Sequence, residues 1–61
     1  MNSIEVISLL KKNGWVLKDQ KGSHQQYVHS KIKGKITVPF HGKRELSPKT
    51  LHAILKKAGL T

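Results

Sequence analysis

The stretch WVLKDQKGSHQQYVHSKIKGKITVP, residues 15–39, decides the fold, because it alternates β-prone segments with two glycine-containing turns. Turns of this kind join neighbouring strands into antiparallel hairpins. Pro39 cannot donate a hydrogen bond to a sheet, so it ends the last strand. The stretch therefore predicts a three-stranded antiparallel sheet, with strands at residues 15–18, 23–29 and 35–38 and turns at residues 19–22 and 30–34.

A helix is expected on either side of this sheet. Before it, Asn2 and Glu5 have the spacing of a capping box. After it, Ser47 and the proline that follows form a favoured helix start. Apolar residues repeat at helical spacing in both segments, and glycines at 14 and 59 can end the helices. Residues 1–61 therefore predict one α+β domain of order α-β-β-β-α, with both helices on one face of the sheet and the other face open.

The strongest feature of the composition is its charge. Twelve lysine and arginine residues stand against three acidic residues, which gives a net charge of +9 on 61 residues. A magnitude of roughly 2–8 is ordinary for a soluble small domain, so a solvated surface explains part of this charge. An excess of one sign favours a polyanionic partner, nucleic acid first and an acidic protein second.

Several classes of protein fit the sequence poorly. There is no cysteine, and no apolar run is long enough for a secretory signal or a membrane span. We therefore expect no disulfide, no membrane attachment and a cytoplasmic protein.

The chemistry is expected at Gly22, Ser23 and His24, where the second strand begins. If Tyr27 is the core residue of that strand, His24 points to the open face, whereas a buried Val28 would turn His24 inward. Tyrosine buries more area, which favours the outward orientation. Histidine titrates near neutral pH and can serve as base or acid, although a structural or merely exposed histidine also fits this position. Glycine at a turn lets backbone N–H groups approach a phosphate.

Other kinds of catalytic site are poorly supported. Among the four histidines, His24 and His29 lie on opposite faces of one strand, and no pair has metal-binding spacing. The three acids are too scattered for a two-metal nuclease, so we expect no metal and no cofactor. No Ser-His-Asp arrangement supports Ser23 as a nucleophile. RNA carries its own nucleophile, the 2′-hydroxyl, and needs only a base, an acid and cations near the phosphate. The residues therefore fit metal-free RNA cleavage.

The basic residues differ in what their positions explain. Lysines in the last turn of a helix match its dipole, so they need no functional explanation. Lys43, Arg44 and Lys49 instead crowd the start of the second helix, where positive charge costs roughly 0.3–1 kcal/mol each. A helix N-terminus is also a phosphate-binding place. We therefore expect RNA contacts from Lys21, Gly22, Ser23, Lys43, Arg44 and Lys49.

Other residues have weaker assignments. His41, in the loop before the second helix, is the next candidate for RNA contact. For the lysines of the 30–35 turn, solubility and phosphate contact explain the charge equally well. The aromatic residues Trp15, Tyr27 and Phe40 are expected mostly in the core, which leaves little surface for stacking single-stranded bases.

Four segments in the order NGWVL (13–17), GSHQQY (22–27), ITVP (36–39) and TLHAILKKAGL (50–60) resemble the HicA toxin family, also called YcfA-like. The resemblance covers nearly the whole chain. It implies a fold similar to double-stranded-RNA-binding domains and mRNA interferase activity in a prokaryotic type II toxin–antitoxin system. It also implies that His24 is the catalytic residue and that a HicB antitoxin covers the active site. The family often has a second histidine after the catalytic one, where this chain has Gln25.

The sequence thus favours a toxin that is a metal-independent endoribonuclease acting on mRNA. Two alternatives use the same fold and charge without catalysis. One is an RNA-binding module of the double-stranded-RNA-binding type, and the other is an adaptor whose basic face binds an acidic protein.

Overall fold

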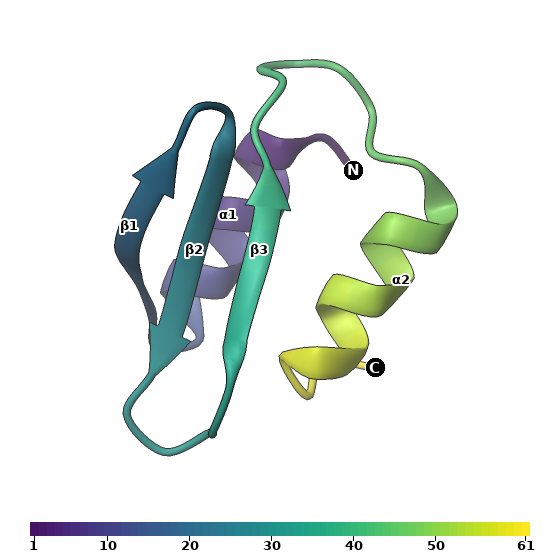
Figure 1. Cartoon of the computed structure of the whole chain (residues 1–61). Helices are drawn as coiled ribbons and strands as arrows, with labels where there is room; N and C mark the ends of the chain where they lie inside the picture. Colours follow the sequence, from purple (N-terminus) through teal and green to yellow (C-terminus); the bar gives the residue numbers. More distant parts are fainter.

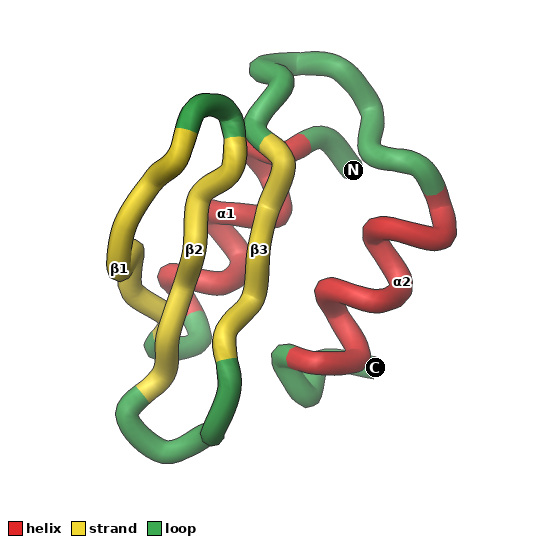
Figure 2. The backbone as a smooth tube through the Cα atoms, in the orientation of Figure 1, coloured by secondary structure: helices red, strands yellow, loops and turns green.

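The computed structural model describes all 61 residues and has the predicted order of elements (Figure 1). The three strands form one antiparallel sheet in the order β1-β2-β3. Figure 2 shows α1 behind the sheet and α2 alongside β3. The α+β fold expected from the sequence is therefore confirmed, with elements α1 (Ser3–Lys12), β1 (Trp15–Lys21), β2 (His24–His29), β3 (Lys35–Pro39) and α2 (Pro48–Lys57).

One small core holds the two helices against the sheet. Alternate residues of the strands point to the same face, so each strand offers its buried residues to the helices. Tyr27, at the centre of the middle strand, is only 1% exposed. The core consists of Val6, Ile7, Leu10, Trp15, Tyr27, Ile36, Val38, Leu46, Ile54 and Ala58.

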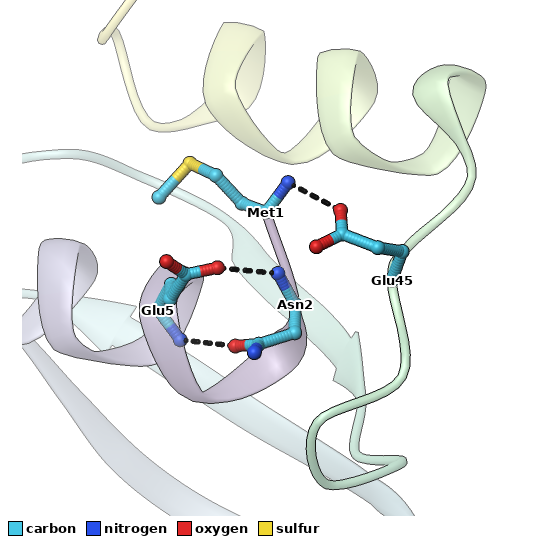
Figure 3. A network of polar contacts seen from close by, with 4 residues as sticks. All are labelled: Met1, Asn2, Glu5 and Glu45. Carbon is cyan, nitrogen blue, oxygen red and sulfur yellow. Dashed lines mark hydrogen bonds and ion pairs between the residues drawn. The ribbon is translucent and has the colours of Figure 1, made fainter.

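The helix ends follow the sequence signals. The Asn2 side chain accepts a hydrogen bond from the Glu5 N–H at 2.9 Å, and the Glu5 carboxylate accepts one from the Asn2 N–H at 2.9 Å, which completes the capping box (Figure 3). In α2 the Ser47 hydroxyl accepts from the Thr50 N–H at 3.2 Å. Gly59 ends α2 with a φ of +74°, a conformation that favours glycine.

The N-terminus is joined to the loop before α2. The Met1 amine donates a hydrogen bond to the Glu45 carboxylate at 2.8 Å (Figure 3). This hydrogen bond raises the pKa of the amine above its ordinary value of 8.0. Backbone contacts continue the connection, since the Leu46 N–H donates to the Met1 carbonyl at 3.1 Å. The start of α1 and the loop therefore form one unit.

The first hairpin differs from the expectation. Residues 19–22 were predicted as the turn, but β1 runs on to Lys21 and only Gly22 and Ser23 lie between the strands. Gly22 has a φ of +58° and makes the tight turn possible. A register shift between Leu17 and Asp19 accommodates the extra residue as a β-bulge. The polar run 18–21 has the composition of a turn because this edge strand is exposed from Val16 to Lys21.

Neither helix is of a length and apolar character that would allow it to cross a bilayer.

Candidate nucleic-acid interface

The face of the sheet opposite the helices carries three cross-strand rows of side chains. Tyr27 points into the core, so His24, Gln26 and Val28 of β2 point to the open face. The strand register then places a neighbour on each side of them. The rows are Lys21, His24 and Pro39; Asp19, Gln26 and Thr37; and Val16, Val28 and Lys35.

His24 lies at the end of the open face. It is exposed, as the outward orientation requires. Lys21 is its partner on β1 and Pro39 its partner on β3. No protein group hydrogen-bonds to the imidazole, so both ring nitrogens are open to a ligand. A histidine with a lysine across the strand has the components for proton transfer and for stabilising a phosphate charge.

The turn beside His24 is open to a ligand backbone. Nothing lies within 4 Å of the position that a Cβ on Gly22 would occupy. The Gln20 side chain donates to the Gly22 carbonyl at 3.0 Å, which fixes the turn from the β1 side. On the other side, the Phe40 N–H donates to the Ser23 carbonyl at 2.6 Å. The loop that follows β3 therefore starts next to His24.

That loop, residues 40–46, is fastened to α1 by a buried serine. Ser3 is 0% exposed, and its hydroxyl donates to the Gly42 carbonyl at 3.1 Å. The same oxygen accepts from the His41 N–H at 3.3 Å. Lys43 and Arg44 are exposed on this anchored loop. Ser3 carries no functional signal in the sequence, because a serine at a helix start has the pattern of an ordinary capping residue.

The chain matches the family described as HicA toxin of bacterial toxin-antitoxin over residues 4–60. It belongs to the HicA toxin family. No curated protein matches the chain. The family match includes every strand, all of α2 and all of α1 except its first residue, so the His24 end of the sheet lies within it.

The structure groups most of the predicted site residues of this HicA chain. The turn of the first hairpin contains four of them in a row, Lys21, Gly22, Ser23 and His24. The loop that carries Lys43 and Arg44 begins beside this turn. Lys49 is separate, since it lies in the first turn of α2, the helix that follows the far end of the loop (Figure 1). That first turn has no acidic residue. Pro48 has no N–H, the Thr50 N–H donates to the Ser47 hydroxyl and the Leu51 N–H donates to the Ser47 carbonyl. Lys49 is therefore the group that this turn offers to an anion.

Phe40 lies outside the core, and the titratable side chains form no metal-binding cluster. Phe40 was expected mostly in the core, and this is wrong: its side chain is 37% exposed. It follows Pro39, the last paired residue of β3, so the core does not extend to it. The structure brings together no group of three or more His, Asp or Glu side chains that could hold a metal ion.

Proposed function

We propose that this HicA toxin is a metal-independent endoribonuclease that cuts mRNA in the cytoplasm. The observation that carries the proposal is the position of His24, exposed at the end of the open face with Lys21 across the strand and the basic loop beside it. A single-stranded RNA on this face would present a phosphate to His24 without any opening of the protein.

The proposed reaction is a transesterification within the RNA. A base removes the proton of a 2′-hydroxyl, and the 2′-oxygen attacks the adjacent phosphorus. The bond from phosphorus to the 5′-oxygen breaks, and that oxygen takes a proton from an acid. The products are a 2′,3′-cyclic phosphate and a 5′-hydroxyl. His24 serves as the base or the acid, while Lys21 and the backbone N–H groups of the Gly22–Ser23 turn stabilise the developing negative charge.

An antitoxin of the HicB type would stop this reaction by covering the open face. Membership of a toxin–antitoxin family supports such a partner. The exposed basic groups around His24 favour an acidic surface on it, because opposite charges attract and fix the orientation of a complex.

The decisive variant is His24→Ala. Loss of a general acid or base reduces a rate by about 10²–10⁴-fold, so cleavage by this variant should fall by that amount in excess EDTA. Wild-type protein should leave 5′-hydroxyl ends when a single-stranded RNA is cut and its ends are mapped. His52→Ala is the matched control, because His52 is an exposed histidine on α2 and should be dispensable.

Full cleavage by a folded His24→Ala variant would end the proposal.

The fold and the net charge also suit a second function, a non-catalytic module that binds duplex RNA. That function predicts no cleavage by either protein and an affinity for duplex RNA that falls steeply with salt.

A further inference from the structure

A second basic site lies at the opposite end of the sheet from the first hairpin. The turn between β2 and β3 encloses an open hollow of about 490 Å³. Four of the nine residues that line it are lysines, and none is acidic. The lysines are Lys18, Lys31, Lys33 and Lys35, and the apolar residues Val28 and Ile32 complete the wall.

These lysines have no counter-ion. The only ion pair in the structure joins the Met1 amine to Glu45, far from the hollow. Asp19 follows Lys18 on β1 but does not line the hollow. A fifth cation is close, since Lys57 Cε lies 3.7 Å from the position of a Cβ on Gly34. Four lysines that line one hollow without an acidic residue favour an anionic ligand.

His29 connects the start of the turn that lines the hollow to the end of α1 and to the core. His29, at the end of β2, accepts the Lys31 N–H at 3.0 Å through Nδ1. Its Nε2 contacts the Asn13 carbonyl at 3.0 Å, and its ring packs edge-on against Trp15 with 5.1 Å between ring centroids. These contacts hold the backbone at the start of the turn against the end of β2.

The open face connects this hollow to His24. Val28 lines the hollow and points to the same face as His24, because the two are four residues apart on one strand. At the usual rise of a strand the separation is roughly 13 Å. The row of Asp19, Gln26 and Thr37 lies between them. The amide of Gln26 and the hydroxyl of Thr37 can hydrogen-bond to a nucleic acid there. An RNA strand that places one phosphate at His24 can therefore reach the hollow with a phosphate a few nucleotides away.

We propose that this lysine hollow is a phosphate subsite that binds the RNA backbone on one side of the cut. The proposal rests on the function proposed above for its substrate, single-stranded RNA. Phosphate contacts position a nucleic acid without reading its bases. The hollow accordingly sets a minimum substrate length and contributes affinity that does not depend on sequence.

The test is RNA binding by a triple variant, Lys31→Gln/Lys33→Gln/Lys35→Gln, in the His24→Ala background, so that no RNA is cut. The control triple variant, Lys11→Gln/Lys12→Gln/Lys56→Gln, removes the same charge from the helix C-termini. For single strands the salt dependence of log K has a slope of about −0.7 per neutralised phosphate. The hollow variant should lose at least about tenfold in affinity at low salt, and its slope should become shallower by about 2. The control should lose much less.

Equal losses in the two triple variants would overturn the subsite, because net charge alone would then explain binding. Unchanged RNA affinity with loss of binding to polyglutamate would also overturn it, in favour of an acidic protein ligand. If the hollow variant loses RNA binding but the wild type cuts no RNA, the hollow stands as a site for RNA phosphates, while the nuclease function and the position of the site beside a cut fail.

A length series tests the position of the subsite with catalytically competent protein. Substrates are trimmed from the 5′ side or from the 3′ side of the cut. With full-length RNA, the protein that carries the three lysine substitutions but keeps His24 should show a raised KM and an unchanged kcat, since a distant phosphate contact contributes uniform binding. With RNA trimmed on the correct side, the hollow variant and the wild type should become equal. A difference that persists with every trimmed substrate would place the lysine effect elsewhere.

Discussion

Gly14 has a φ of +93°, and a Cβ added there would lie 2.8 Å from Nε2 of His29. The imidazole cannot swing away at low cost. Its Nδ1 accepts the Lys31 N–H, so Nε2 carries the proton and donates to the Asn13 carbonyl. Gly14 and His29 thus form a close contact between the end of α1 and the end of β2.

Gly14→Ala should therefore be more harmful than an ordinary loss of a helix-ending glycine. Gly59→Ala is a matched control, because Gly59 ends α2 with a φ of +74° and has open space around its Cβ position. We expect Gly59→Ala to lower the free energy of unfolding by about 1 kcal/mol and Gly14→Ala to lower it by about 2–3 kcal/mol. Urea unfolding of the two variants measures the difference. Equal losses would show that the contact with His29 does not matter.

At the scale of secondary-structure elements, Ser3 anchors the loop of residues 40–46 to α1. It joins the first turn of α1 to residues 41 and 42, which are 38 and 39 residues away in the sequence. Because the hydroxyl is buried, its removal leaves the Gly42 carbonyl and the His41 N–H without that partner.

Ser3→Ala should lower the free energy of unfolding by about 1–3 kcal/mol. Ser8→Ala, an exposed serine on the same helix, should change it by less than about 0.5 kcal/mol. Hydrogen exchange of the loop amides gives a second readout, since the loop of the Ser3 variant should exchange faster than that of the Ser8 variant. Loop protection identical in both would contradict the anchoring role.

At the scale of the whole molecule, repulsion between like charges opposes the stability that the small hydrophobic core provides. Ten buried hydrophobic residues hold together a chain of net charge +9 with a single ion pair. Two like charges about 8 Å apart repel by roughly 0.5 kcal/mol in water. Screening reduces this repulsion, because the Debye length falls to about 8 Å at physiological ionic strength.

Salt should therefore stabilise the folded chain. Raising NaCl from low to near-molar concentration should increase the free energy of unfolding by about 1 kcal/mol, which corresponds to about 4–8 °C in Tm for a domain of this size. The triple variant of the lysine hollow should show a smaller increase, since it starts with less repulsion. A Tm that falls with NaCl in thermal unfolding would contradict this account.

The sequence determined the features that depend on neighbours along the chain. The capping box at Asn2, the start of α2 at Ser47 and the left-handed glycine at 59 are local arrangements, and each is confirmed. The number and order of the strands followed from the β-prone segments and the turns between them. The inward position of Tyr27 followed from the larger area that a tyrosine buries. The outward position of His24 followed from Tyr27, whereas its catalytic role stays a prediction.

Only the tertiary structure decided the features that depend on residues far apart in the sequence. Pairing with β2 across a bulge determined the end of β1. Phe40 is exposed because the core does not extend past the end of β3. The anchoring of the loop by Ser3 and the convergence of Lys18 with the lysines of the second turn join distant segments. Propensity and periodicity describe single elements, so they carry no information about which side chains meet once those elements pack.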